Sequence, residues 1–570
     1  MGLVNSALQI GRSALLAYQG GLQIIGNNIA NLGSEGYTRQ SPMIAPLGGT
    51  YEADGFKPGG GVALAEIRRN IDETLNVRLR MALGDQNGAL AEHQALVELE
   101  SLFNALSDED LSSQLNAFFN AWADLQNTPE DLSTRSLVLN QGSVLAEAFR
   151  RTLQLLNSQY EALNQQITQT VGRINEIAAD LADVNVQIVM GEASTTTPVS
   201  MLRDQRDRLL AELSELVAIQ TREQPDGSVN VYIGNEPLVQ RATYRELTTT
   251  SETVNRRQTD VVRWKDNNKQ ITPWGGRLEG LMTARDTHVV DQINKLDALA
   301  LAVIADVNRI HAGGQGLEGF QTLTGSYDVF DPAVALNTAN NNLPWVPTNG
   351  SFLITVTNTT TGLQETVRID VDLDGIGADT TLNSLAADIT ATVSDVTATA
   401  TADNRLKIDA GAGYTVTFGE DTSGVLGALG LNTFFSGKDA STIALDGNMV
   451  GQPNRVAAAT SGLVGDGTNA GQIAELATAA SAHLNNGQSL LDQYNATMAE
   501  LATTSSAAQN AVGAADVISG ALQAQWESVS GVNLDEETLM LMRYQRAFQG
   551  AARIVTVVDE LIQQVLVMTR

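Results

Sequence analysis

The segment that decides the fold is LNQGSVLAEAFRRTLQLLNSQYEALNQQITQTVGRINEIAADLADVNVQI, residues 139–188. Apolar and small side chains recur in it at alternating spacings of three and four residues, which is the heptad repeat of packed helices. A helix rises 1.5 Å per residue, so the unbroken repeat predicts a helix of about 75 Å. Gly191 and Pro198 follow it and predict where the helix ends. Such a length predicts a rod-like helical bundle.

Two further interior segments carry the same repeat and are expected to pack in the same bundle. One runs from Val289 to Ile310 and ends at Gly313 and Gly314. The other consists of Leu491, Tyr494, Met498, Leu501, Ser505, Ala508, Val512, Ala515, Ser519, Leu522 and Trp526.

Each end of the chain also carries a heptad stripe. Isolated terminal helices are marginal, because chain ends are disordered unless something holds them. We therefore expect the two helices to pair, and to be firmly ordered only where neighbouring copies cover their other faces. This predicted axial self-assembly interface consists of Val4, Leu8, Leu15, Tyr18, Leu22, Ile25, Ile29, Leu32, Tyr544, Phe548, Val555, Val558, Ile562 and Val565. Gly11 interrupts the first stripe, and Gly33 is the expected C-cap.

Strand patterns interrupt the helical frame in two places. A Pro225–Gly227 turn followed by alternating Val229, Val231 and Ile233 predicts a hairpin. Residues 330–440 are rich in Thr, Asp and Gly and alternate apolar with polar residues, which predicts strands around one short helix. The predicted fold is mainly α, a long coiled-coil-like bundle built from N- and C-terminal segments, with an inserted β-rich α+β domain.

Three domains follow from this reading. Residues 1–65 with 527–570 form a terminal-helix assembly domain, 66–329 with 441–526 the rod-like bundle with its hairpin, and 330–440 an inserted outward-facing domain.

Composition excludes several classes of function. The net charge of −30 disfavours binding to nucleic acid or to anionic membrane surfaces. The chain has no cysteine, which excludes disulfides and thiolate chemistry. The start, MGLVNSALQIGRSALL, has neither the basic region nor the long apolar region of a cleaved signal peptide. No stretch is apolar enough over about 18 residues to be inserted in a membrane.

Motifs for catalysis, cofactors and metals are missing from the sequence. GxSxG and HExxH do not occur, so we expect no enzyme activity and no cofactor. Asp370, Asp372 and Asp374 precede Gly375 like the first half of a calcium loop, but Thr381 occupies the position of the bidentate Glu. We therefore expect no metal site and no stabilisation by calcium.

Two motifs near the chain ends are more specific. The first is Asn27-Asn28-Ile29-Ala30-Asn31, followed by Ser34-Glu35-Gly36-Tyr37-Thr38-Arg39-Gln40, and the second is Ser530-Gly531-Val532-Asn533-Leu534-Asp535-Glu536-Glu537. Asn533 is the expected N-cap, and Asp535, Glu536 and Glu537 suit the positive end of the last helix dipole.

These motifs resemble the bacterial flagellar axial proteins, which form the rod, the hook and the hook-associated parts. The motif residues that carry the resemblance are Asn27, Asn28, Asn31, Gly36, Tyr37, Asn533, Asp535 and Glu536. The GYTRQ and SGVNLDEE segments, with Leu429–Phe435, are similar to the family of the first hook-associated protein. The resemblance implies a structural subunit that joins hook to filament by helical self-assembly.

The resemblance also implies partners and a location. The partners would be copies of the chain, the hook protein, the second hook-associated junction protein and a cytoplasmic flagellar export chaperone. The location would be the hook–filament junction outside the cell, reached by type III export without a cleaved signal peptide. Two alternatives stay open: another axial protein, such as a hook or distal rod subunit, or a secreted adhesin that uses residues 330–440.

Overall fold

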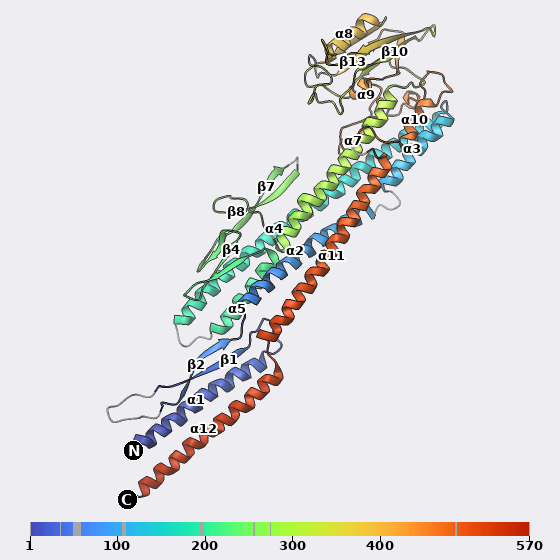
Figure 1. Cartoon of the computed structure of the whole chain (residues 1–570). Helices are drawn as coiled ribbons and strands as arrows, with labels where there is room; N and C mark the ends of the chain where they lie inside the picture. The colour runs from blue at the N-terminus through green and yellow to red at the C-terminus, as the bar shows by residue number, and fades with distance from the viewer. Residues whose placement is uncertain are drawn as a thin grey trace. The chain divides into compact units, whose positions relative to one another are not determined.

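The computed structural model describes residues 2–34, 36–48, 59–104, 110–193, 199–254, 257–273, 275–484 and 487–568. Long helices dominate this part of the chain, and the strands form small antiparallel sheets (Figure 1). The predicted fold class, mainly α with a β-rich insert, is confirmed. The chain divides into two compact units. The first unit contains Met1–Gln94, Leu163–Thr283 and Ala507–Arg570, and the second Ala95–Ala162 and Ala284–Ser506.

Three helices contribute to both units. They are α2 (Glu73–Asn104), α4 (Leu132–Ala193) and α11 (Leu490–Ser530). Every residue of the repeat predicted from Leu139 to Ile188 is buried or nearly so along α4, which confirms the long helix. Along α11, every predicted position from Leu491 to Trp526 is buried or half-buried, while most residues between them are exposed. The heptad pattern therefore identifies the packed side of both helices.

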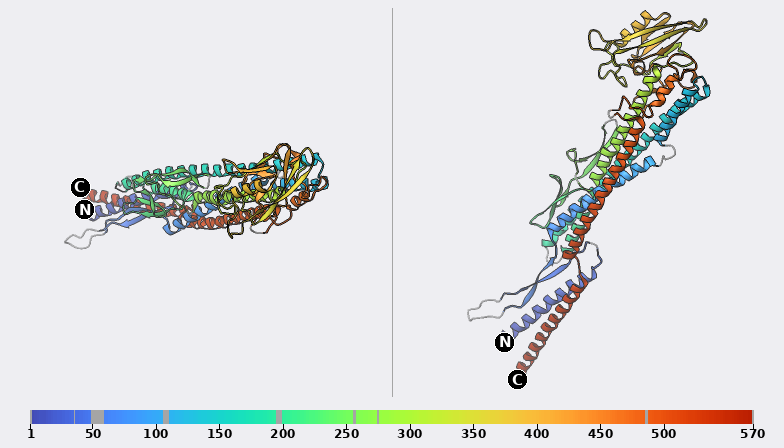
Figure 2. Two further views of the ribbon diagram at one scale, coloured as in Figure 1. Left: turned by 90° about the horizontal axis from the view of Figure 1, so that it is seen from above. Right: turned by 45° about the vertical axis from the view of Figure 1, so that its right-hand side comes forward.

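In the first unit, α1 (Gly2–Ala30) lies alongside α12 (Leu534–Met568), and the two chain ends lie at the same end of this pair in every view (Figures 1 and 2). A hairpin of β1 (Gln40–Pro46) and β2 (Val62–Arg69) packs on α1. The helix α1 ends at Ala30, so the expected end at Leu32 and Gly33 was wrong. The amide Nδ2 of Asn31 turns back to the carbonyl oxygen of Asn27, 2.9 Å away, and this local bond competes with another helical turn.

The strands of the first unit that follow α4 pack along it. Asn164, Asn175 and Asn185 of α4 donate hydrogen bonds to their backbone. A four-stranded sheet follows α5, and its first two strands form the hairpin predicted around Pro225–Gly227. The elements are α5 (Val199–Leu216), β3 (Gln220–Glu223), β4 (Val229–Ile233), β5 (Glu236–Gln240), β6 (Thr243–Tyr244), β7 (Leu247–Val254), β8 (Arg257–Trp264) and α6 (Gly276–Thr283). Strands β7 and β8 pair with each other.

In the second unit, α3 (Leu111–Asn127) and α10 (Thr468–Glu475) pack together, and both lie near α7 (Val290–Ala312). A π-helix at Ala284–Val289 precedes α7, which ends at Gly313 as predicted. A cluster of buried rings joins these helices to the chain beyond residue 430. It consists of Phe118, Trp122, His311, Phe434 and Phe435, with ring centroids between 4.9 and 6.2 Å apart.

The strands of the second unit form two three-stranded sheets with the orders β11-β10-β14 and β12-β13-β9. The predicted strands around Ile354, Val367 and Val416 and the predicted helix at Leu382 are all present. The elements are β9 (Thr322–Thr324), β10 (Gly350–Asn358), β11 (Gln364–Val371), α8 (Leu382–Thr392), β12 (Val396–Ala400), β13 (Leu406–Ala410), β14 (Tyr414–Gly419), α9 (Val425–Ala428), β15 (Phe435–Ser436), β16 (Ala444–Leu445) and a 3₁₀ turn at Pro453–Arg455.

The division into three domains stays a prediction. Strand β9 precedes residue 330 yet pairs with β13, and Phe434 lies before residue 440 yet packs on α3. Among the described helices, none is both long enough and apolar enough to cross a bilayer.

Candidate functional site

The candidate site is the place where the two ends of the chain meet in the first unit. Helices α1 and α12 run antiparallel. Large side chains of α12 lie against glycines of α1. A Cβ added to Gly21 would lie 2.4 Å from the ring of Tyr544, and one added to Gly11 would lie 2.7 Å from Val555. The rings of Tyr18 and Tyr544 meet edge to face with centroids 6.1 Å apart. The two helices therefore interlock, with glycines on α1 receiving side chains of α12.

The residues of the predicted interface occupy different positions in this pair. Ile25 and Val558 are buried between the helices. Most of the others are half-buried: Leu8, Leu15, Tyr18, Leu22, Ile29, Tyr544, Phe548, Val555 and Ile562. Leu32 lies in the turn after α1 and is 46% exposed, Val565 is exposed, and the side chain of Val4 lies outside the described part of the chain. The predicted stripes thus face each other within one chain, and their contact with other copies remains a prediction.

The two motifs converge on the buried side chain of Asn28, which is 1% exposed. Its Nδ2 donates to the carbonyl oxygen of Gln40 at 2.8 Å and to Oε2 of Glu537 at 2.9 Å. Its Oδ1 accepts from the hydroxyl of Tyr37 at 2.9 Å and from the backbone N–H of Gln40 at 3.1 Å. One amide therefore connects α1, the start of β1 and the first turn of α12.

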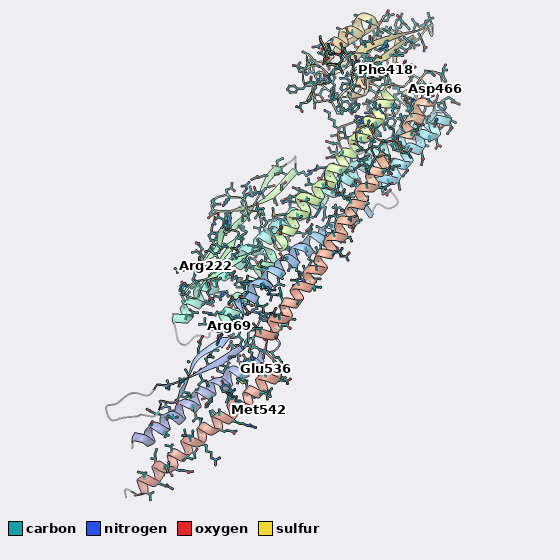
Figure 3. All side chains as sticks on the ribbon, viewed as in Figure 1. Arg69, Arg222, Phe418, Asp466, Glu536 and Met542 are labelled. Atoms are coloured by element: carbon teal, nitrogen blue, oxygen red, sulfur yellow. The ribbon has the colours of Figure 1, made fainter. Side chains whose placement is uncertain are left out.

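Arg39 ties the first motif to the second. Its Nε donates to Oε1 of Glu537 and its Nη1 to Oε2 of Glu536, both at 2.7 Å. The backbone N–H of Arg39 also donates to the carbonyl oxygen of Ser530 at 2.9 Å. Glu537 is buried and Glu536 is exposed. Figure 3 labels Glu536 at the start of α12. The buried ion pair between Arg39 and Glu537 has hydrogen-bond partners on both carboxylate oxygens, as a buried charge requires.

The other motif residues shape the turn between α1 and β1. Asn31 bonds to Asn27, and Nδ2 of Asn27 donates to the hydroxyl of Tyr37 at 3.4 Å. Gly36 has φ +70°, the left-handed region that favours glycine, and an added Cβ would lie 2.5 Å from Cγ of Arg208. Burial, followed by the negative charges of Asp204 and Glu537, raises the pKa of Tyr37 to about 12, so its hydroxyl stays a donor at neutral pH.

The second motif starts α12 as expected. Asn533 is the N-cap, because its Oδ1 accepts from the backbone N–H of Asp535 at 2.9 Å and, more weakly, of Glu536. Asp535 is exposed in the first turn, where the helix dipole favours a carboxylate.

A second group of charges continues the network toward α5. Nη2 of Arg69, at the end of β2, lies 2.9 Å from Oδ1 of Asp204 and also bonds to Asp207 and Thr38. Burial disfavours the charged form of Arg69, but Asp207 and Asp204 overcome this effect and raise its pKa. Burial also raises the pKa of Asp204, against the opposing effect of Arg69. This group holds the hairpin against α5.

A cleft of about 620 Å³ lies beside this charged group. Its lining residues come from α2, α5, α11 and the turn before β1, and they include Thr38, Arg80, Asp207 and Trp526.

Sequence reasoning missed the residues that complete the network. Glu537 was assigned only to the helix dipole, whereas Arg39, Gln40 and Arg69 were not singled out. One signal for Glu537 was available: it lies four residues before Leu541, so it continues the apolar stripe of α12 with a carboxylate. A charge on a buried stripe indicates a partner. The distant partners Asp204 and Asp207 carry no comparable signal in the sequence.

The acidic loop of the second unit holds the one group of three carboxylates, among the described residues, that lie close enough together to share a metal ion. These are Asp372, Asp374 and Asp379, with oxygens within 4.8 Å of one another. Asp374 and Asp379 accept backbone N–H groups of their own loop. Thr381, at the position of the missing Glu, instead caps α8 by accepting from the backbone N–H of Ser384 at 3.1 Å. The loop is explained by its own turn geometry.

Comparison with known families gives two matches along the chain. Residues 96–326 match the family described as "Flagellar hook-associated protein FlgK helical domain". Residues 523–568, which contain the second motif and α12, match the family described as "Flagellar basal body rod FlgEFG protein C-terminal".

Individual relatives extend the similarity to both ends. The chain is 28% identical over 580 aligned residues, 99% of each protein, to "Flagellar hook-associated protein 1" of Salmonella typhimurium. It is 27% identical over 97% of each protein to the protein of the same name in Escherichia coli. A solved structure, "The structure of the flagellar hook junction protein FlgK from Burkholderia pseudomallei", covers 80% of this chain and 100% of its own at a TM-score of 0.54 and 15% identity, a likeness of fold.

Paired terminal helices joined by the two end motifs, on a frame of long helices, define a structural protein of the bacterial flagellar axis. The match of residues 523–568 to the C-terminal family of the flagellar basal body rod proteins supports this broad class. The family matched by residues 96–326 and the relatives that align over nearly the whole chain indicate a narrower family within this class. Over nearly its whole length the chain is similar to proteins of the flagellar hook-associated protein 1 family.

Proposed function

We propose that this chain is the subunit that joins the flagellar hook to the filament, and that it does so by helical self-assembly. The observation that carries the proposal is the convergence of both end motifs on Asn28, which makes one structural element of the two chain ends. The printed name of the Burkholderia relative, a flagellar hook junction protein, supports the same role. The proposed location is the hook–filament junction, reached by type III export without a cleaved signal peptide.

The proposed partners follow from that position. They are copies of the chain, the hook protein on one side, the second hook-associated protein on the other, and an export chaperone in the cytoplasm. Contacts that repeat between unlike surfaces of identical chains generate a helical array. In the proposal, residues 1–65 with 527–570 supply these contacts, and residues 330–440 face outward.

The paired helices leave a second apolar face for neighbouring copies. Leu539, Met542, Ile554, Val557 and Leu561 of α12 are between 45 and 64% exposed, although α12 already buries another stripe against α1. Figure 3 labels Met542 on this helix. Exposed apolar side chains that gather on one side of a helix are typical of interaction surfaces. We assign this face of α12 to contact with a second copy.

A charge placed on this face tests the proposal. Val557→Asp should leave the purified chain folded, because Val557 is about half exposed, but should prevent assembly by forcing an unpaired carboxylate into the contact. Cells that lack the protein are complemented with the variant, and flagellin in the medium and on the cells is measured. The expected result is unanchored flagellin in the medium with helix content unchanged by circular dichroism.

Gln545→Asp is the matched control, because it adds the same charge to α12 at an exposed polar position. It should leave filaments attached. Normal filaments in the Val557→Asp strain would contradict the assignment of this face.

A further inference from the structure

We infer that Glu537 and Asn28, together with Gly11 and Gly21, set the register in which α1 pairs with α12. The pairing is a property of the single chain, and only its consequence for assembly rests on the proposed function. A register-setting residue determines which positions face each other. It differs from a residue that only adds stability.

The observed register is constant to within one residue along the pair. From Asn28 to Gly21 the position on α1 falls by seven residues, and its partner on α12 rises by seven, from Glu537 to Tyr544. From Gly21 to Gly11 it falls by ten, and the partner rises by eleven, to Val555. Three specific contacts therefore report the same antiparallel alignment.

The apolar stripes alone do not specify this alignment. Both repeat every seven residues, so sliding α12 by one heptad, about 10 Å along its axis, again places stripe on stripe. Aliphatic contacts between such stripes are of similar kind in either position. Some other feature has to distinguish the native register from the shifted ones.

The polar pair and the glycines supply that distinction. If α12 slides by one heptad in one direction, Glu537 faces Gly21 and no longer the Asn28 amide. The ring of Tyr544 then meets Ala14, where the native register has a glycine. Moved in the other direction, the ring of Tyr544 meets Asn28. Each shifted register leaves a buried polar group without its partner or puts a ring where a Cβ stands, and both are costly. A single buried polar residue fixes register in coiled coils by the same effect.

The register matters for assembly because it places the exposed apolar face of α12. The side chains of Leu539, Met542 and Val557 move with α12, whereas the hairpin β1–β2 packs on α1. A shift of about 10 Å would move the exposed face of α12 relative to the hairpin on α1. Neighbouring copies could then no longer contact both surfaces at once.

Engineered cysteines measure the register directly, since the chain has no cysteine of its own. In the native register, Ala14 faces Ala551, so Ala14→Cys with Ala551→Cys should cross-link on mild oxidation of the purified full chain. Ala7→Cys with Ala551→Cys faces across the pair only after a one-heptad shift. Mass spectrometry of the cross-linked peptides separates links within one chain from links between chains.

The test variant is Glu537→Leu, which continues the apolar stripe and removes the polar requirement, while Asn28 keeps its bonds to Gln40. The matched control is Glu536→Leu, which removes the exposed carboxylate bound to the same Arg39. In Glu537→Leu we expect the native link to fall by at least half and the shifted link to appear, with a melting midpoint no lower than that of the parent. In Glu536→Leu only the native link should form.

Two outcomes would overturn the inference. One is a native link as complete as in the parent, which would show that Glu537 does not set the register. The other is loss of the native link without the shifted link, together with a lower melting midpoint, which would show a purely stabilising role. Both are read on the unassembled chain, so they are distinct from a failure of the proposed junction function.

Discussion

Gly21 of α1 limits how closely the first and last helices can approach. Because an added Cβ would lie 2.4 Å from the ring of Tyr544, Gly21→Ala forces the helices apart or rotates the ring. Overpacking of this kind costs about 1–3 kcal/mol. We expect faster hydrogen exchange in peptides from both α1 and α12 of the purified monomer.

The control for this prediction is Gly26→Ala in the same helix. Gly26 is exposed, with nothing within 4 Å of an added Cβ, so alanine should stabilise the helix by about 0.5–1 kcal/mol. Equal slowing of exchange in both variants would show that Gly21 is not a contact point.

His311 makes the second unit sensitive to acid. Its ring is buried, with Nδ1 2.8 Å from the carbonyl oxygen of Asn432 and Nε2 accepting the backbone N–H of Ala457 at 3.0 Å. Burial lowers the pKa of His311 to about 4, with a hydrogen bond to Asn432 opposing the shift and Arg135 adding to it. The unfolded chain therefore binds this proton more tightly than the folded chain does between about pH 6.5 and 4.

The stability that depends on neutral His311 is complete above about pH 6.5 and falls as the pH drops toward 4, by roughly 3 kcal/mol in total. Hydrogen exchange of α3 and α7 measured at pH 7 and pH 5 should show this loss. His311→Gln should lose less stability between the two pH values. An identical loss in the variant would assign the acid sensitivity to other groups.

At the scale of helices and strands, the sequence predicted where the long helices lie and which side of each is packed. It did not predict which side chains pack against them. The repeat from Leu139 to Ile188 specified which side of α4 is buried, because a heptad stripe reports one face of a helix. It did not reveal that Gly142 is small because the ring of Phe434 enters there, 2.5 Å from an added Cβ. Likewise, Gly11 interrupts the stripe of α1 and Gly21 lies beside it, and at both positions α12 supplies the bulk. A glycine in a heptad stripe indicates that a side chain from another element packs there. In these cases that side chain lies hundreds of residues away in the sequence.

The polar part of the site was predicted only in part, for a related reason. The cap at Asn533 depends on a backbone N–H two residues away, so the local sequence contains both donor and acceptor. The bond between Asn28 and Glu537 joins opposite ends of the chain and depends on the antiparallel pairing of two helices. Local chemistry was therefore visible in the sequence, and long-range pairing was not.

The segment around Phe434 ties the inserted strands to the helices. Phe434 is fully buried, and its ring lies 5.3 Å from that of Trp122 and 5.5 Å from that of His311. Phe434→Ala should cost about 3–5 kcal/mol and speed hydrogen exchange in α3 and α7. Phe330→Ala, in a residue that is 80% exposed, is the control and should change stability by less than about 0.5 kcal/mol. Similar exchange in the two variants would remove the aromatic cluster from the account.

At the scale of the whole molecule, the structure indicates which part of the inserted domain predicted at residues 330–440 can be deleted without disturbing the helices. Deleting residues 330–440 would remove Phe434 and with it the aromatic cluster. Residues 349–420 are a better choice, because the backbone N–H of Thr348 donates to the carbonyl oxygen of Ser423 at 2.9 Å, so the cut ends lie together. This deletion keeps Asp421, whose carboxylate accepts backbone N–H groups at the start of α9.

Joining residue 348 to 421 through a short glycine linker removes α8 but should preserve the remaining helices and filament attachment, whereas deletion of 330–440 should disrupt both. Circular dichroism and complementation of a strain lacking the protein give the two readouts. If the shorter deletion folds and is exported but filaments never attach, the removed strands carry contacts that we assign to the helices.

The central claim is that the chain forms the junction between hook and filament through its paired ends. Immunogold labelling of intact flagella, with an antibody against residues 349–420, tests it most directly. The account predicts label confined to a narrow zone where the hook meets the filament, and no label there in cells carrying Val557→Asp. Label along the filament, or at the base of the hook, would contradict it.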